Sequence, residues 1–380
     1  MKQKLVIIYL VAFSISLSAT EKIPAKKEII SAMTRVCDWQ LANLIKTEYV
    51  DKDTLKHKYR DSNWIRGTFL TGLLAQYYST KNQKYLDVAI ALCSRNKWKL
   101  GPKFQFADDL CIGQAYLELY KLKKDKELIA DVEFRLKAIM KNPKRGPVVG
   151  WKGNDNWDWC DALYMAPPVF SRMYSITKNQ AYLDTMTVLW FDTYNLLYDK
   201  KEKLFYRDAR FSERNDGTQQ LSKNGKKIFW SRGNGWVIGG LTRLLQDMPK
   251  NYTHRAEFEK VYKEMCEKIA TLQGEDGLWR SSLLDTEEYP APETSGSGFY
   301  CYALAYGINN GLLPSKKYLP VILKAWKGLN WAIDKQTGML GWVQAVGADP
   351  RSVTSSETAE YGAGAFLLAG SEIIKMKKNK

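Results

Sequence analysis

A short motif occurs twice in this chain with nearly the same residues, and it limits the possible folds more than any other feature. Residues 78–87 read Tyr-Ser-Thr-Lys-Asn-Gln-Lys-Tyr-Leu-Asp, and residues 174–184 read Tyr-Ser-Ile-Thr-Lys-Asn-Gln-Ala-Tyr-Leu-Asp. A weaker third copy, Lys-Lys-Tyr-Leu, lies at 316–319. Each copy joins two stretches of helical periodicity by a short polar turn. Internal repeats of this kind indicate stacked helical hairpins.

The periodicity of apolar residues extends the same pattern over the whole chain. Helical stretches begin near residues 30, 65, 83, 109, 126, 160, 180, 232, 255, 297, 316 and 358. Strand signals are weak, and the best of them lie at 204–210 and 338–343. Twelve helices form six hairpins, which can close into a ring with the Gly- and Ala-rich helices inside. We therefore predict an all-α protein, an (α/α)6 barrel of six helical hairpins.

The N-terminus has the features of an export signal. A basic start is followed by an apolar run over residues 5–16 and by small residues around Ala19. The run is too short for a comfortable membrane span, and no cysteine follows it for lipid attachment. We predict a signal peptide over residues 1–19 and a single catalytic domain over residues 20–380. The protein is expected to be exported without a membrane anchor, to the periplasm rather than the medium.

Composition restricts the chemistry and the partners. Lys and Arg number 57 against 41 Asp and Glu, a formal charge of +16. This charge favours an acidic oligosaccharide as partner, and no nucleic-acid-binding signature is present. The alternative is that scattered lysines only solvate the surface. Six cysteines fall on helical patterns and are expected to be buried thiols, and two distant histidines form no metal-ligand cluster. We expect neither a metal nor a cofactor.

The segments that precede the Gly- and Ala-rich helices are rich in acids and aromatic residues. In a closed ring of hairpins these helices all start at one end of the barrel, so the segments would converge on one cleft. The first of them contains Trp64, which we expect to contact substrate. The six segments are residues 63–66, 106–109, 157–161, 229–236, 292–298 and 356–362.

The segment Trp-Asp-Trp-Cys-Asp at 157–161 is the strongest candidate for catalysis. Indole rings offer a flat apolar face to a sugar, and they remove water from a neighbouring carboxyl group. Loss of water raises the pKa of Asp161 and lets it hold a proton near neutrality. Asp109, in the preceding hairpin, is a natural second acid. The alternative is that these acids only cap helix starts, where Asp is favoured for its hydrogen bonds to the first-turn amides.

The segment Trp-Ser-Arg-Gly-Asn-Gly-Trp at 230–236 is the second candidate. Arg232 and Trp236 are four residues apart and so share a helix face. Arginine can bind a uronate carboxylate through two hydrogen bonds, while tryptophan stacks on the sugar ring. The alternative is a structural arginine paired with Asp161 or Glu293.

With these segments in place, the chain resembles the unsaturated rhamnogalacturonyl hydrolases of glycoside hydrolase family 105. The resemblance spans roughly residues 26–375 and is carried by the segments 159–168, 230–236 and 294–298, with support from 361–369. It implies an (α/α)6 barrel that hydrates the 4,5-unsaturated uronate left by pectin lyases at the non-reducing end of rhamnogalacturonan fragments. Hydration of this vinyl ether gives a hemiketal, which opens and releases the next sugar.

The resemblance also implies roles for individual residues. Asp161 would be the general acid/base, and Asp109 would be the second acid. Substrate contacts would come from residues around the cleft, with one departure from the family, because Arg207 stands where many members have a histidine. The expected contact residues are Trp64, Trp159, Met165, Arg207, Trp230, Arg232, Trp236 and Glu293.

Four other functions stay open at this point. An unsaturated glucuronyl hydrolase acting on glycosaminoglycan fragments would share the barrel and the hydration chemistry. An inverting glycosidase of the same fold would also cleave saturated substrates. A polysaccharide lyase would use a different acid and base, and a non-catalytic glycan-binding barrel would leave the substrate unchanged.

Overall fold

The computed structural model describes residues 22–44, 61–146, 156–213 and 217–376, and within them outer and inner helices alternate along the chain. The outer helices are α1 (Lys26–Ala42), α3 (Gln83–Arg95), α6 (Ala130–Lys141), α9 (Ala181–Leu197), α11 (Arg255–Thr271) and α13 (Ser315–Trp331). The inner helices are α2 (Trp64–Thr80), α5 (Gly113–Lys123), α8 (Pro167–Thr177), α10 (Ser231–Asp247), α12 (Thr294–Asn309) and α14 (Glu360–Lys375). Short helical turns precede three of these helices: α4 (Ala107–Leu110), η1 (Lys126–Ile129) and α7 (Ala162–Met165).

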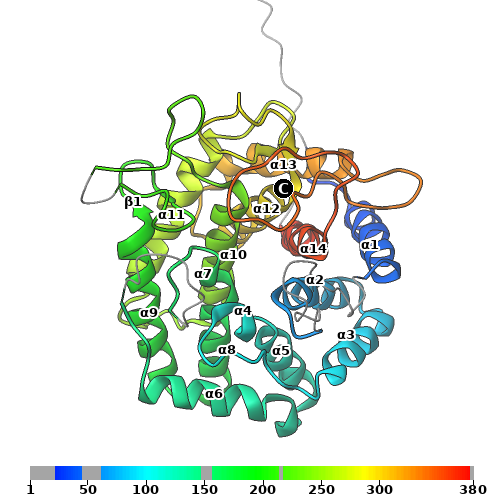
Figure 1. The fold of residues 1–380 in the computed structure, drawn as a ribbon. Helices are drawn as coiled ribbons and strands as arrows, with labels where there is room; N and C mark the ends of the chain where they lie inside the picture. The colour runs from blue at the N-terminus through cyan, green and yellow to red at the C-terminus, as the bar shows by residue number, and fades with distance from the viewer. Residues whose placement is uncertain (1–21, 45–60, 147–155, 214–216, 377–380) are drawn as a thin grey trace, which may run out of the picture.

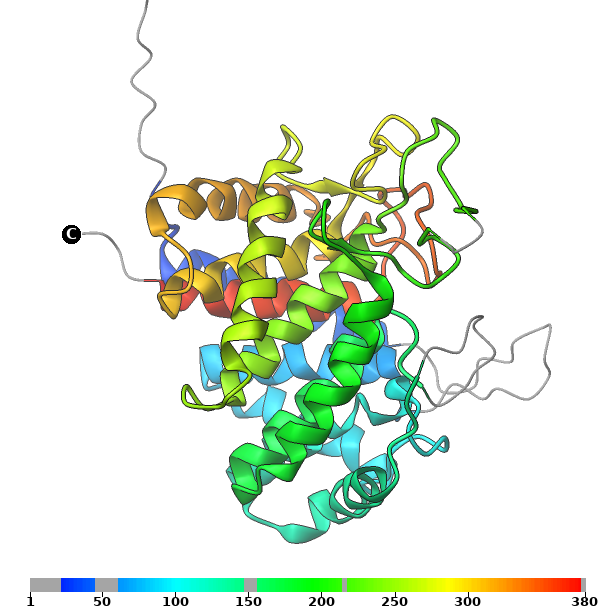
Figure 2. The same ribbon diagram turned by 90° about the vertical axis from the view of Figure 1, so that its left-hand side faces the viewer.

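The inner helices form a closed ring. Each packs on the next, from α2 through α5, α8, α10 and α12 to α14, and α14 packs on α2. Figure 1 looks into this ring, with the outer helices around it. In Figure 2 the loops that lead into the inner helices lie together on the right, and the described ends of the chain lie on the left. The predicted all-α (α/α)6 barrel with one loop-rich end is therefore confirmed.

The repeated motif is a helix stop with a defined geometry. Lys81 and Lys178 follow the inner helices α2 and α8 and adopt the left-handed conformation, with φ of 58° and 61°. The amide of each donates to the carbonyl of the tyrosine four residues earlier, at 2.7 Å in both cases. Each ammonium lies over the ring of that same tyrosine, 5.8 Å and 5.7 Å from its centre. Lys124 ends α5 in the same way. The repeat thus turns the chain from inner to outer helices.

Glycines let the inner helices approach closely, as their composition predicted. A Cβ on Gly72 of α2 would lie 2.6 Å from the carbonyl oxygen of Gly364 in α14. A Cβ on Gly240 of α10 would lie 2.1 Å from the carbonyl oxygen of Leu163 in α7. Larger residues at these positions would force the helices apart, so the narrow interior of the barrel depends on them.

Strands contribute little to the described residues. The pair β1 (Tyr198–Asp199) and β2 (Leu204–Phe205) includes the start of the predicted 204–210 segment, and Leu340 in the second predicted segment forms a single bridge with Ile333. The pair β3 (Trp279–Arg280) and β4 (Pro292–Glu293) had no clear signal in the sequence. All six cysteines are buried free thiols, as expected.

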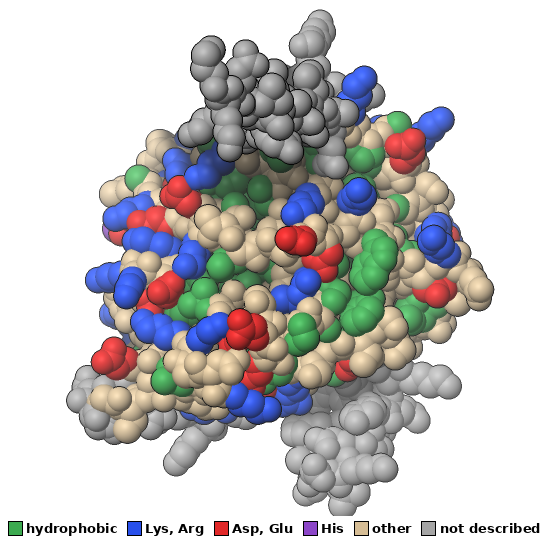
Figure 3. All heavy atoms as spheres, turned by 90° about the horizontal axis from the view of Figure 1, so that it is seen from above, with side chains coloured by type: hydrophobic (Ala, Val, Ile, Leu, Met, Phe, Trp, Pro, Cys, Tyr) green, Lys and Arg blue, Asp and Glu red, His purple; other side chains and the backbone are tan. Residues whose placement is uncertain are grey.

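The surface and the ends of the chain bear on two further predictions. On the face in Figure 3, Lys and Arg side chains alternate with Asp and Glu, which fits the alternative of scattered, solvated charge there. No helix among the described residues is long and apolar enough to cross a membrane. The predicted signal peptide at 1–19 lies outside the described residues.

Candidate active site

The segment that carries Asp161 is fixed against the segment that carries Arg207. Trp159 and Asp208 form an antiparallel bridge, and the amide of Cys160 donates to the carbonyl of Arg207 at 2.8 Å. Trp159 is buried and stacks near Phe106, with ring centres 5.1 Å apart. Segments about fifty residues apart in sequence are therefore joined by backbone hydrogen bonds at the loop-rich end of the barrel.

The Gly-Asn-Gly sequence at 233–235 explains how this junction is held. The side chain of Asn234 accepts from the amide of Phe205 at 2.8 Å and donates to its carbonyl at 3.0 Å. A Cβ on Gly233 would lie 3.0 Å from the sulfur of Cys160, next to Asp161. A Cβ on Gly235 would lie 3.1 Å from the Cα of Gly296. Asn234 thus positions the strand that leads to Arg207, a role that the sequence did not suggest.

Asp161 does not cap the helix that follows it. It precedes α7 with helical backbone angles, and its side chain makes no capping hydrogen bond. Its Oδ2 atom accepts from Nε of Arg207 at 3.3 Å, and Cys160 Sγ lies 3.7 Å from Oδ1. Burial raises the pKa of Asp161, while the positive charges of Arg207 and Arg232 oppose the rise. The arrangement fits an acid that holds a proton, and the capping alternative does not fit it.

The structure distinguishes Asp109, the predicted second acid, from its neighbour Asp108. The carboxylate of Asp109 is turned to the preceding loop, where Oδ2 accepts from the amide of Lys103 at 2.8 Å. A Cβ on Gly101 would lie 2.0 Å from its Oδ1 atom, so the loop wraps closely around it. Burial and then the charge of Asp161 raise the pKa of Asp108 to about 7. Neighbouring positions in a short helical turn face different directions, so Asp108 is a further candidate for the second acid beside the predicted Asp109.

The side chain of Arg232 is hydrogen-bonded to backbone carbonyls of the protein itself. Its two terminal nitrogens donate to the carbonyls of Gln344 and Ala345 at 2.6 and 2.9 Å. Its guanidinium lies over the rings of Trp230 and Tyr361, 4.4 and 4.9 Å from their centres. The predicted two-point grip on a uronate carboxylate does not fit this conformation, in which only Nε is without a hydrogen-bond partner. The predicted alternative pairing with Glu293 is not seen either.

Trp230 holds the same loop through its indole. Its Nε1 atom donates to the side-chain oxygen of Gln344 at 3.0 Å, and the residue is 2% exposed. The hydroxyl of Tyr361 donates to the carbonyl of Gln344 at 2.6 Å. Together with Arg232, these groups fix the loop between α13 and α14 over the start of α10.

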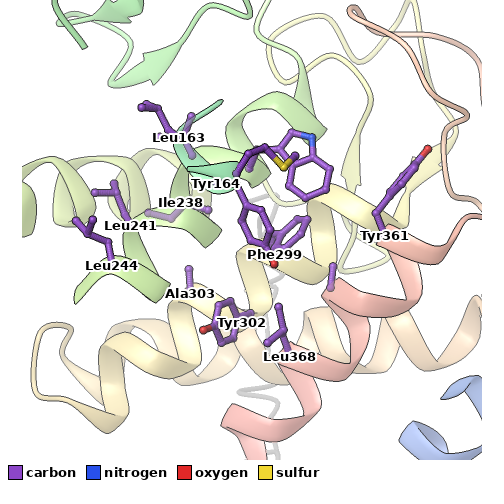
Figure 4. Packing of buried hydrophobic residues seen from close by; sticks show 14 of the residues in the cluster. Leu163, Tyr164, Ile238, Leu241, Leu244, Phe299, Tyr302, Ala303, Tyr361 and Leu368 are labelled. Carbon is purple, nitrogen blue, oxygen red and sulfur yellow. The ribbon is translucent and has the colours of Figure 1, made fainter. Parts of the chain in front are cut away.

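An aromatic cluster fills the barrel axis below the loops. Trp236 is 1% exposed and packs on Tyr164 and Phe299, with ring centres 5.0 and 4.8 Å apart. Figure 4 shows Tyr164 and Phe299 packed together in this core, with Tyr361 beside them. Trp64 is partly exposed, stacks on Tyr361 at 5.4 Å, and is a candidate for sugar contact. Trp236 therefore forms a buried floor, and Met165 is buried beneath the loops as well.

Glu293 is a helix cap and not a residue of the cleft wall. It is fully buried before α12, and its two carboxylate oxygens accept from the amides of Ser295 and Gly296 at 3.0 and 2.7 Å. The hydroxyl of Ser295 and the amide of Gln344 also donate to it. With its oxygens occupied, Glu293 stabilises the positive end of α12. The predicted substrate contact is replaced by this role.

Comparison with known proteins identifies the family of this site. Residues 32–377 match the family described as Glycosyl Hydrolase Family 88. The chain belongs to Glycosyl Hydrolase Family 88. It is 39% identical over 365 residues to an unsaturated 3S-rhamnoglycuronyl hydrolase of Formosa agariphila, with 92% of each chain covered. A protein of the same name from an Alteromonas species is 29% identical, covering 90% of this chain and 84% of that protein.

Solved structures show the same barrel. A glycosyl hydrolase family 88 protein from Bacteroides vulgatus matches this family 88 enzyme with a TM-score of 0.81 and 31% identity, covering 92% of this chain and 99% of that chain. A protein named as a polysaccharide lyase matches with a TM-score of 0.82 and 30% identity, covering 92% and 98%. The expected glycoside hydrolase of this fold family is thereby confirmed.

The other end of the family 88 barrel holds a separate polar network. Asp247 at the end of α10 pairs with Lys121 at 2.6 Å and with Arg172 at 2.9 Å, and Arg172 also pairs with Glu118 at 2.6 Å. A cavity of about 200 Å³ adjoins these groups. Because the charges satisfy one another far from the loop-rich end, the network is structural.

Among the described residues, no cluster of three or more His, Cys, Asp or Glu side chains could hold a metal ion.

Proposed function

We propose that this enzyme removes a 4,5-unsaturated uronate from the non-reducing end of lyase-generated oligosaccharides, by hydrating the ring double bond. The observation that carries the proposal is the setting of Asp161. Its carboxyl group is buried, caps no helix, accepts a hydrogen bond from Arg207 and influences the pKa of Asp108 at the loop-rich end of the barrel. Such a pair can keep one proton at neutral pH and deliver it in an apolar setting.

The chemistry follows from the polarity of the double bond. The double bond joins C4 to C5, and C5 carries the ring oxygen, so a proton from Asp161 adds to C4 and leaves a cation at C5 that this oxygen stabilises. Asp161, now ionised, accepts a proton from water as the water oxygen bonds to C5. The resulting hemiketal opens to a ketone, and the hemiacetal left at C1 then releases the next sugar.

Asp108 and Arg207 act on the state of Asp161 in this scheme. A neighbouring carboxyl group disfavours two negative charges, so the pair keeps a proton before the reaction. Arg207 then stabilises the carboxylate of Asp161 after the proton has left. Trp64 is partly exposed and offers an aromatic face to the sugar ring, supported from behind by the buried Tyr361.

The released sugar is proposed to be rhamnose or a rhamnose derivative. Elimination by a lyase erases the configuration at C4, so glucuronate and galacturonate give the same unsaturated ring. Selectivity must then come from the anomeric linkage and from the sugar that leaves. The two relatives at 39% and 29% identity are named for rhamnoglycuronyl substrates, whereas an unsaturated rhamnogalacturonyl hydrolase of Bacillus subtilis is 21% identical. The higher identities to the rhamnoglycuronyl hydrolases favour a rhamnoglycuronyl linkage over the rhamnogalacturonyl linkage of pectin.

The test is incubation with purified unsaturated disaccharides that differ in the leaving sugar. The proposal expects loss of the ultraviolet absorbance of the conjugated double bond and release of rhamnose. Turnover of glycosaminoglycan disaccharides alone would instead favour a glucuronyl hydrolase. A polysaccharide lyase would create absorbance from saturated polymer, and an inverting glycosidase would cleave saturated disaccharides, so either result would overturn the proposal.

We also propose that the enzyme works outside the cytoplasm, in the periplasm. The basic start and apolar run of residues 1–19 support export, and an acidic oligosaccharide delivered by extracellular lyases is available there. N-terminal sequencing of the mature protein and cell fractionation test this. An intact Met1 in a cytoplasmic fraction would contradict it.

A further inference from the structure

Three charged residues within the segment 207–210 form a continuous chain of hydrogen bonds that ends on Asp161. Asp208 accepts from Nη1 of Arg207 at 2.8 Å and from Nη2 of Arg210 at 2.8 Å through Oδ2. Through Oδ1 it accepts from Nε and the amide of Arg210 at 2.8 and 3.0 Å. Nε of Arg207 then donates to Asp161 at 3.3 Å. We call Arg207, Asp208 and Arg210 the charged strap.

The charged strap runs from solvent to the buried acid. The side chain of Arg210 is 44% exposed, while those of Arg207 and Asp208 are 9% and 5% exposed. Asp208 is a shared acceptor, and it binds Nη1 of Arg207 while Nε of the same guanidinium donates to Asp161. Asp208 and Arg210 are bonded to one another and to Arg207, and Arg207 is the member of the strap that donates to Asp161, so we expect them to act on Asp161 through Arg207 or through their electric field.

We propose that Asp208 and Arg210 are positioning residues that control how strongly Arg207 pairs with Asp161 during the reaction. The inference rests on the proposed function, in which Asp161 donates the proton. In the resting enzyme Asp208 competes with Asp161 for the same guanidinium. Arg210 in turn offsets the charge of Asp208 and limits its hold on Arg207.

The electrostatics give the two residues opposite signs. Without the charge of Asp208, Arg207 turns more fully to Asp161 and favours its ionised form, so the pKa of Asp161 falls. Without Arg210, the negative charge of Asp208 loses one of its two guanidinium partners. Asp208 then repels the ionised form of Asp161 more strongly and binds Arg207 more tightly, and both effects raise the pKa of Asp161. Both substitutions keep the other groups that act on Asp161, which are Asp108 from α4, Arg232 from α10 and the adjacent thiol of Cys160. They also keep Asp158, whose pKa burial raises to about 6 and which responds to Asp208 and Arg207 as well.

The experiment compares Asp208→Asn and Arg210→Gln with the wild type on an unsaturated disaccharide. The alkaline limb of the kcat/KM profile reports the acid that must hold a proton in the free enzyme. We expect this limb to move to lower pH in Asp208→Asn and to higher pH in Arg210→Gln, by about half a pH unit or more in each case. A purely structural role would lower activity without opposite shifts.

Matched controls come from an exposed ion pair between outer helices. Lys317 of α13 lies 2.7 Å from Glu267 of α11, so Glu267→Gln and Lys317→Gln repeat the two charge changes away from the site. Neither control should move the profile. The inference would be overturned if the alkaline limb did not move in Asp208→Asn and Arg210→Gln, or if it moved in the same direction in both. The proposed function would stand in either case. If Asp208→Asn fails to fold, the test rests on Arg210→Gln, which changes a half-exposed side chain. A wild-type enzyme inactive on every unsaturated disaccharide would overturn the proposed function itself.

Discussion

Nε of Arg207 lies 3.3 Å from Oδ2 of Asp161, so the acid proposed to donate a proton has a guanidinium as its direct neighbour. Burial favours the protonated form of Asp161, and Arg207 favours the ionised form. A group used first as an acid and then as a base has to pass between these forms in each turnover. The opposed influences keep the free-energy gap between the two forms small, which suits both steps.

Replacement of Asp161 by asparagine tests its role most directly. The variant keeps the shape of the side chain but cannot exchange a proton, so we expect kcat to fall by about 10²–10⁴-fold. Because Asp161 caps no helix, thermal stability should stay near that of the wild type. Turnover and thermal unfolding measured on one preparation check both. Near-native turnover would transfer the role to another acid, and a collapse of stability would indicate a structural role.

Asp108 and Asp109 are predicted to respond differently to the same substitution. Asp108→Asn removes the group whose pKa depends on Asp161, and we expect kcat/KM to fall at least tenfold with stability retained. Asp109→Asn weakens the acceptor of the Lys103 amide, and we expect a loss of about 1–3 kcal/mol in the free energy of unfolding. Urea unfolding and steady-state kinetics separate the two effects. The reverse pattern would restore Asp109 as the second acid, as the sequence suggested.

The pH dependence follows from the raised pKa values of the pair. Burial raises the pKa of both carboxyl groups, that of Asp108 to about 7, so we expect at least one of the two groups to hold a proton up to near neutrality. Activity should therefore fall as the pH rises above about 7, when the last proton leaves the pair. In Asp108→Asn the like charge is gone, so the alkaline limb should move to lower pH. A wild-type profile that stays flat to about pH 9, roughly two pH units above the pKa of Asp108, would contradict a carboxylic acid as the proton donor.

The sequence predicted the fold well because the fold rests on local signals. Helical periodicity and the repeated turn depend on neighbours along the chain, and the left-handed Lys81 and Lys178 lie at the ends of helices where the repeat placed a turn. The closed ring followed from the number of hairpins. The strands β3 and β4 were missed, because two-residue strands carry no periodic pattern.

The candidate site was only partly predictable, for a different physical reason. Asp161 was found because its aromatic neighbours adjoin it in sequence. Glu293 and Arg232 were assigned to substrate, but Glu293 binds the nearby amides of Ser295 and Gly296. Arg232 binds the carbonyls of Gln344 and Ala345, which are 112 and 113 residues away in the chain. Residue type alone does not tell whether a charged group faces a ligand or a carbonyl. The clamp of Asn234 on Phe205 was missed for the same reason.

Replacement of Arg232 by methionine distinguishes a structural from a binding role. The loss of two hydrogen bonds from the guanidinium removes the Arg232 donor from the carbonyl of Ala345 and leaves the carbonyl of Gln344 with the Tyr361 hydroxyl. We expect the free energy of unfolding to fall by about 2–4 kcal/mol and activity to fall with it, as the loop loses its anchor. Urea denaturation with parallel kinetics checks this. An unchanged free energy with a strongly raised KM would show that Arg232 binds the uronate carboxylate.

Asp247, at the end of the barrel opposite the loops, provides a stability test that should leave catalysis unaffected. Its pairing with Arg172 and Lys121 holds its pKa well below the usual range. Asp247→Asn removes one of the two acidic partners of the buried Arg172 and the partner of the partly exposed Lys121, so we expect a loss of about 3 kcal/mol in the free energy of unfolding at neutral pH, with kcat per folded molecule retained. A depressed pKa stabilises the fold above the unfolded value of about 4, and this stabilisation is lost as the pH falls toward the folded value. The difference between wild type and variant should therefore shrink below about pH 4, as measured by urea unfolding across pH. The exposed Glu267→Gln should cost little at either pH, and an Asp247 effect that does not depend on pH would refute the ion-pair account.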